Sequence, residues 1–208
     1  MDIDSYNQIK EFKFCTEYYP REIRLDEIAS WAIWSSSNLH DTKIIKNSIE
    51  ELRPNIIFCG LNFSGKGILD FENPNWTSWK NFHSTSKMDT RLYKVLNDSK
   101  YRGAYMTDII KCVPTKSAKE LKNKIECGKI NMNAQVNIFK DEIKVLNNNN
   151  IEIYLMGRDT ESYFKNYFYE FIKDKIKIYK YILHPSPETR LDDVAFYERI
   201  SEQLGIIN

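Results

Sequence analysis

The sequence predicts an α/β protein: a three-layer α/β/α sandwich around a central, mainly parallel sheet of four strands. Four short apolar runs, rich in β-branched and aromatic residues, alternate with segments long enough for helices, and this alternation is typical of parallel strands joined by crossover helices. A length of 208 residues with 42% hydrophobic and 28% charged residues fits one soluble globular domain. We therefore expect a single domain over residues 1–208.

The elements are predicted in chain order. Residues 1–50 look helical and are expected to pack on the rest of the domain, with an apolar-rich stretch at 25–34 and a helix over 47–54 that Pro54 stops. The four strands are predicted at 55–60, 103–110, 151–157 and 177–185. Helices are predicted between them at 89–99, 117–146 and 159–174, and a closing helix at 194–205 ends on Gly205.

Composition limits the classes of function. Thirty basic and 29 acidic residues give a net charge of +1, so any surface for nucleic acid must be a local one. The four cysteines form no C-x-x-C pair, and we expect free buried thiols, no metal and no cofactor. No apolar run approaches 18 residues and the N-terminus does not resemble a signal peptide, so we expect a cytoplasmic protein without a membrane partner.

The stretch GLNFSGKG, residues 60–67, is close to a phosphate-binding P-loop. A P-loop places Ser or Thr after its lysine to ligate magnesium, whereas Gly67 follows Lys66 here. A P-loop protein also needs a strand that ends in Asp, and the two later strands end in Gly157 and in His184-Pro185. A nucleotide hydrolase is therefore kept only as a less favoured alternative.

Two turns are candidate ligand-binding positions, because ligands of open parallel sheets bind beyond the carboxyl ends of the strands. Residues 60–67 follow the first predicted strand and residues 184–190 follow the last. The sequence predicts that both turns lie at one edge of the sheet.

The motifs in these turns, GLNFSG at 60–65 and HPSP at 184–187, resemble those of the uracil-DNA glycosylase superfamily. The first is similar to the mismatch-specific uracil and thymine glycosylase branch, and the second to the main uracil-DNA glycosylases. Segments 71–80, 103–121 and 155–164 also resemble the mismatch-specific branch. The resemblance implies a uracil-DNA glycosylase-like fold, a monomer, and hydrolysis of the N-glycosidic bond of uracil or a related damaged base in DNA, without metal or cofactor.

The resemblance implies two catalytic residues. Breaking this bond builds positive charge on the sugar and negative charge on the departing base, so the site must position a water and stabilise an anion. Asn62 would orient the water, and His184 would donate a hydrogen bond to a carbonyl oxygen of the base. The competing structural interpretations are a turn asparagine and a satisfied structural histidine.

Other residues are implied to hold the substrate. The base would be bound by a set that includes an aromatic side chain for stacking: Gly60, Leu61, Phe63 and Phe71. DNA would be contacted by Ser64, Lys66, Ser186 and Arg190.

The chain departs from the family at two positions. Phe63 replaces the proline of the first motif, and Glu188 replaces the apolar wedge that follows HPSP. Without a wedge, flipping a base out of duplex is less well compensated, so we expect a preference for single-stranded or mismatched DNA. From a different class, a catalytically silent nucleic-acid-binding protein with the same fold stays open.

Overall fold

The computed structural model describes residues 1–65, 76–186 and 191–207. Its centre is a sheet of five strands in the order β3-β5-β4-β6-β7. The strands are β3 (Ser30–Trp31), β4 (Arg53–Phe63), β5 (Ala104–Lys111), β6 (Ile151–Met156) and β7 (Ile176–Ile182). Strands β4 to β7 are parallel, as the sequence predicts, and β3 pairs with β5 in the antiparallel direction. The predicted sheet of four strands is therefore one strand short.

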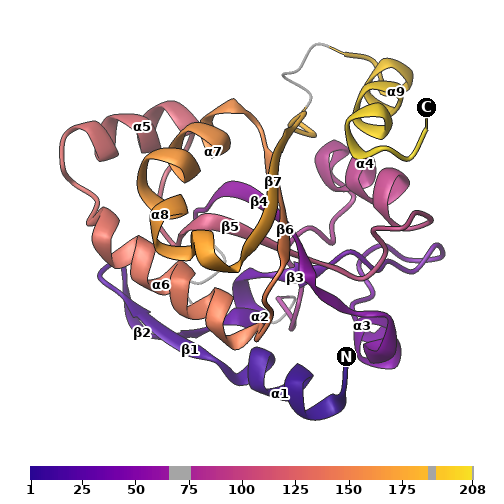
Figure 1. Cartoon of the computed structure of the whole chain (residues 1–208), viewed down its shortest axis with the longest axis horizontal. Helices are drawn as coiled ribbons and strands as arrows, with labels where there is room; N and C mark the ends of the chain where they lie inside the picture. The colour runs from indigo at the N-terminus through magenta and orange to yellow at the C-terminus, as the bar shows by residue number, and fades with distance from the viewer. Residues whose placement is uncertain (66–75, 187–190, 208) are drawn as a thin grey trace.

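Helices cover both faces of this sheet, so the three-layer α/β/α arrangement is confirmed (Figure 1). One layer holds α5 (Ala118–Glu126), α6 (Met132–Val145), α7 (Arg158–Tyr163), the π-helical turn η2 (Phe164–Phe168), α8 (Tyr169–Ile172) and the short 3-10 helix η3 (Lys173–Lys175). The other holds α4 (Lys87–Leu96) and α9 (Asp193–Leu204). The predicted helix over 117–146 is divided into α5 and α6 at Gly128, whose φ of +67° breaks the helix. Gly205 caps α9 in the left-handed conformation, as predicted.

The first 50 residues are not the helical part that the sequence predicts. After α1 (Ile3–Glu11) comes a separate two-stranded hairpin, β1 (Lys13–Thr16) and β2 (Tyr19–Arg24). Short helices follow: α2 (Leu25–Ile28), α3 (Lys43–Asn47) and the 3-10 turn η1 (Ile49–Glu51).

The apolar stretch 25–34 illustrates why that prediction is wrong. Continuous apolar runs do not distinguish a buried helix from a buried strand. Here Ser30 and Trp31 lie beside Met106 and Tyr105 of β5, and pairing with this open sheet edge decides the outcome. Pro54 likewise lies within β4, so the helix predicted over 47–54 shrinks to η1.

The core lies on both faces of the sheet. Side chains of neighbouring strand residues point to opposite faces, so Phe58 belongs to the cluster under α4 and α9 while Ile57 and Cys59 belong to the cluster under α6. Cys112 is also buried, but Cys15 and Cys127 are exposed, so the predicted burial of the thiols holds for only half of them.

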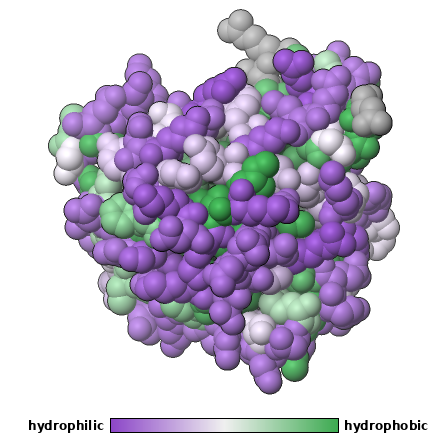
Figure 2. All heavy atoms as spheres, viewed as in Figure 1, coloured by the Kyte–Doolittle hydropathy of each residue, from purple (hydrophilic) through white to green (hydrophobic). Residues whose placement is uncertain are grey.

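The surface in view is mostly hydrophilic, with apolar residues gathered near its middle, where β7 lies in Figure 1 (Figure 2). Strand β7 is an edge strand with lysines on its outer positions, which is a common protection against pairing with another chain. In the described part of the chain, no helix is long and apolar enough to cross a membrane.

Candidate functional site

The parallel strands bring Asn62 and His184 to the same edge of the sheet. Asn62 is the penultimate residue of β4, and His184 follows β7 by two residues. Strand β6 lies between β4 and β7, so two strand spacings, about 10 Å, separate these strands. The predicted placement of the two turns at one edge follows from this topology.

Asn62 is held with its amide in a defined orientation. Its Nδ2 donates to the carbonyl oxygen of Val113 and to the Thr115 hydroxyl, each at 3.1 Å. Its Oδ1 is buried and has no hydrogen-bond partner within the described chain. Since buried acceptors are rarely left unmatched, this oxygen is available to a water or a ligand.

His184 is fixed by backbone groups. Its Nδ1 accepts a hydrogen bond of 3.1 Å from the backbone N–H of Ser186, so a neutral ring carries its proton on Nε2 and can donate from there. The ring also lies against Gly157, where an added Cβ would come within 3.2 Å of Cδ2. Gly157 has a φ of +96°, so both its backbone and the neighbouring ring exclude a larger residue.

Two adjoining hollows open at this edge. The first, about 360 Å³, is lined by residues that include Met156, Gly157, His184 and Ser186. The second, about 240 Å³, contains Asn62 and Ser64. Leu61 and Ala118 line both hollows. Asn62 and His184 therefore occupy neighbouring hollows that share a wall.

Arg91 of α4 holds the turn that follows β7. This guanidinium, 1% exposed, donates to the carbonyl oxygens of Pro185 (3.3 Å), Ser186 (3.1 Å) and Leu191 (2.8 Å). It also donates to the Asp193 carboxylate at 3.0 Å, which lowers the pKa of that carboxyl. Arg91 is thus a positioning residue that ties the His184 turn to α4 and α9.

A buried carboxyl lies beside this edge. Asp108 of β5 faces Gly60 of β4 across the parallel pair, and a Cβ at Gly60 would lie 2.3 Å from its Oδ1. Its other oxygen accepts a long hydrogen bond of 3.3 Å from Asn81. Burial raises the pKa of Asp108 to about 6, against the opposing effects of Lys111 and Asn81.

The remaining predicted site residues do not all line the two hollows. Gly60 lies within β4 and not in a turn, because the strand continues to Phe63. Phe63 is buried in the core with its ring 6.0 Å from that of Trp76, and it lines neither hollow. Ser64 lines the second hollow, and its carbonyl oxygen accepts from Tyr19. Lys66, Phe71 and Arg190, together with Gly67 and Glu188, lie outside the described residues.

Sequence reasoning missed Arg91 and Asp108. Arg91 is one charged residue in an amphipathic helix, and nothing local distinguishes it from a solvated arginine. Asp108 carried a usable signal, because a carboxyl in the run MTDII interrupts a strand that is otherwise suited to full burial.

Within residues 1–65, 76–186 and 191–207, no three His, Cys, Asp or Glu side chains gather as metal ligands. No protein-family model matches the chain, and no curated protein matches it.

Proposed function

We propose that this protein is a DNA glycosylase with a uracil-DNA glycosylase-like fold that hydrolyses the N-glycosidic bond of uracil or a related damaged base. The observation that carries the proposal is the pair of side chains at one sheet edge: the unmatched Oδ1 of Asn62 and the Nε2 donor of His184. Such a pair supplies what the reaction needs, an acceptor that orients a water and a donor for the departing base.

The two hollows suit a flipped nucleotide in size and chemistry. Each is lined by both polar and apolar groups, and their combined volume lies within the range of small-molecule sites. In the proposed arrangement the base lies towards His184 and the sugar and its water towards Asn62. Arg91 keeps the His184 turn in place, which matters because a misplacement of about 1 Å can cost 10²-fold in rate.

Asp108 lines neither hollow, but it lies opposite Gly60, the neighbour of Leu61, which lines both, and it is proposed to read the edge of the base. A neutral carboxyl presents one donor and one acceptor, which matches the carbonyl and N–H of a uracil edge, whereas an ionised one presents acceptors only. The pKa of about 6 allows both forms near neutral pH. Protonated Asp108 therefore favours uracil, and ionised Asp108 opposes it.

The experiment is incubation with a single-stranded oligonucleotide that carries one uracil, followed by alkaline cleavage at abasic sites. Under single-turnover conditions, Asn62→Ala is expected to slow base release far more than it weakens binding. His184→Ala is expected to slow it by about 10²–10³, as for the loss of one oxyanion donor. We expect activity to persist in EDTA, since neither group needs a metal.

Lys140→Gln on α6 serves as the matched surface control and is expected to keep the wild-type rate. Wild-type protein that binds the oligonucleotide without releasing base would favour the silent nucleic-acid-binding alternative. Rates within a few-fold of wild type in both site variants would indicate that Asn62 and His184 have structural and not catalytic roles.

A further inference from the structure

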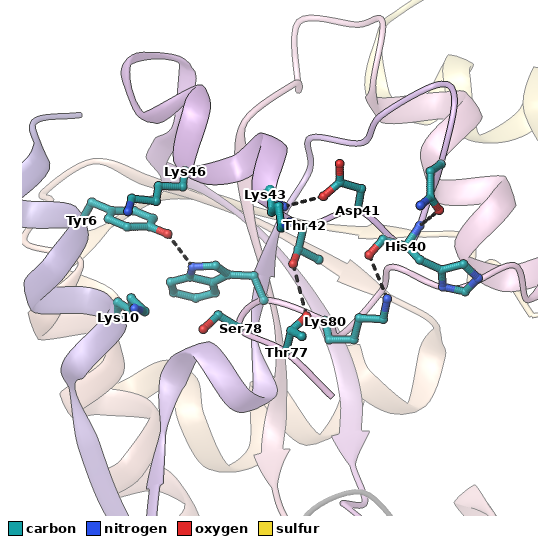
Figure 3. Close-up of a pocket in the computed structure, with 12 residues that line it drawn as sticks. Tyr6, Lys10, His40, Asp41, Thr42, Lys43, Lys46, Thr77, Ser78 and Lys80 are labelled. Carbon is teal, nitrogen blue, oxygen red and sulfur yellow. Dashed lines mark hydrogen bonds between the residues drawn. The ribbon is translucent and has the colours of Figure 1, made fainter. Parts of the chain in front are cut away.

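A second, cationic pocket of about 560 Å³ lies on the β3 side of the molecule, remote from β7. Segments from three parts of the chain line it: α1, the stretch from Asn38 through α3, and residues 77–80 (Figure 3). Lysines occupy each part, with Lys10 on α1, Lys43 and Lys46 on α3, and Lys80 on the segment across from them.

The pocket wall is organised by hydrogen bonds between these segments. Lys80 Nζ donates to the carbonyl oxygen of His40 at 2.8 Å, which joins the 77–80 segment to the loop before α3. The indole N–H of Trp79 donates to the Tyr6 hydroxyl at 2.9 Å, which joins the same segment to α1. Both rings are buried, so the floor of the pocket is fixed by the core.

Positive charge in the pocket exceeds negative charge. Among the described residues of the lining, four lysines stand against one acidic residue, Asp41, whose Oδ1 already accepts from the backbone N–H of Lys43. In the described part of the chain, neither Lys43 nor Lys46 has a carboxylate within ion-pair distance, and Lys10 has only the exposed Glu11 at 3.7 Å. Partial burial lowers the pKa of Lys80, and the Asp41 carboxylate opposes this effect only in part.

We propose that this pocket binds a small molecule that carries two or more linked phosphate groups. Lysine ammonium groups are compact point charges that suit phosphate oxygens, and several lysines around one pocket reduce the repulsion between linked phosphates. The volume lies in the range of small-molecule sites. The Thr42 and Thr77 hydroxyls, 3.4 Å apart on facing segments, add neutral donors to the lining.

The shape favours a compact polyanion over a nucleic-acid strand. A strand-binding surface needs phosphate contacts along an extended groove and exposed aromatic rings for stacking. Here the lysines line one hollow, and Trp79 and Tyr6 are 1% and 3% exposed. The proposal is independent of the glycosylase proposal, because no described residue lines both this pocket and the hollows of Asn62 and His184.

The test is titration calorimetry at low ionic strength with inorganic tripolyphosphate, and with orthophosphate and a short thymidine oligonucleotide as comparison arms. Wild-type protein is expected to bind tripolyphosphate more tightly than orthophosphate, and the affinity should fall as salt is added. Lys43→Gln/Lys46→Gln should weaken tripolyphosphate binding by about tenfold, as expected for the loss of two exposed ionic contacts.

Lys173→Gln/Lys177→Gln, in η3 and the edge strand β7, is the control with the same change in charge; both lysines form surface ion pairs, with Glu170 and Glu152, and this variant should bind within about twofold of wild type. Both double variants replace exposed side chains, and equal melting temperatures will confirm that they fold alike. Absence of wild-type binding, an equal loss in both variants, or an orthophosphate affinity equal to that for tripolyphosphate would overturn the proposal. A tighter affinity for the oligonucleotide at equal phosphate concentration, lost in Lys43→Gln/Lys46→Gln, would replace it with a nucleic-acid surface.

Discussion

Two buried carboxyl groups, Glu142 and Asp108, lie beside strand β5 on opposite faces of the sheet. Glu142 of α6 accepts from the hydroxyls of Tyr105 and Thr107, each at 2.8 Å, and its other oxygen lies 2.8 Å from the ammonium of Lys111. Both members of this ion pair are fully buried. Among the described residues, Asp108 has one long hydrogen bond, from Asn81, and a glycine beside it.

The difference lies in the partners of the two carboxyl groups. Glu142 is held by a buried cation and two hydroxyls, whereas Asp108 can still form hydrogen bonds with a ligand. Alternation along β5 sends Tyr105, Thr107 and Lys111 to the α6 face. There the two hydroxyls donate to Oε1 of Glu142, and the ammonium forms an ion pair with Oε2, which has no well-aligned hydrogen bond to a described residue. Asp108 points to the other face, two residues along β4 from the level of Asn62. A buried carboxyl with few partners is costly, and such groups gather where a ligand completes the hydrogen bonding. The comparison therefore assigns a structural role to Glu142 and supports the recognition role that we propose for Asp108.

The largest effect is expected at the satisfied pair. Lys111→Met would leave Glu142 charged and buried without its cation, at a cost of about 3–5 kcal/mol in the free energy of unfolding. Urea denaturation measures this cost. Adding Glu142→Gln should recover part of it, because the uncompensated charge is then removed. A loss below about 1 kcal/mol in the single variant would mean that Glu142 is not the structural charge of the comparison.

Asp108→Asn should instead change how stability depends on pH. The pKa of Asp108 is raised from 3.8 to about 6 in the folded protein, so the folded state binds this proton more tightly than the unfolded chain does. The resulting stabilisation is complete below about pH 4 and is lost as pH rises through 6. Across pH 4 to 7.5, the free energy of unfolding of the variant should gain roughly 2–3 kcal/mol relative to wild type.

Denaturation of both proteins at each pH gives that difference, and the other titrating groups cancel in it. A difference that stays constant with pH would show that Asp108 is ionised in the folded protein as readily as in the unfolded chain.

A smaller effect is expected from Gly60→Ala. The new Cβ would lie 2.3 Å from Asp108 Oδ1, and displacing that carboxyl should cost about 1–3 kcal/mol of stability. The same substitution in an Asp108→Ala background should cost less, because the clashing oxygen is absent. Equal costs in the two backgrounds would show that the strain at Gly60 comes from the backbone and not from Asp108.

The sequence predicts correctly those elements whose local residue pattern matches their place in the fold. The four parallel strands could be predicted because each is a short apolar run between breakers, and their direction placed Asn62 and His184 at one edge. Strand β3 could not be predicted, because two residues are too few to show the alternation of a strand. Its conformation is fixed by pairing with β5. The roles of Arg91 and Glu142 were also hidden, because both depend on partners far along the chain.

The central claim is that Asp108, Asn62 and His184 act together in one site that releases a base. The pH dependence of uracil release tests this claim most directly. Single-turnover rates would be measured from pH 5 to pH 8 with wild type and Asp108→Asn on a single-stranded uracil oligonucleotide. The account predicts that the wild-type rate falls as pH rises through about 6, when Asp108 loses its donor, and that the amide variant is nearly independent of pH and faster at pH 8. No release of uracil at any pH, or a variant whose profile follows that of wild type, would contradict the account.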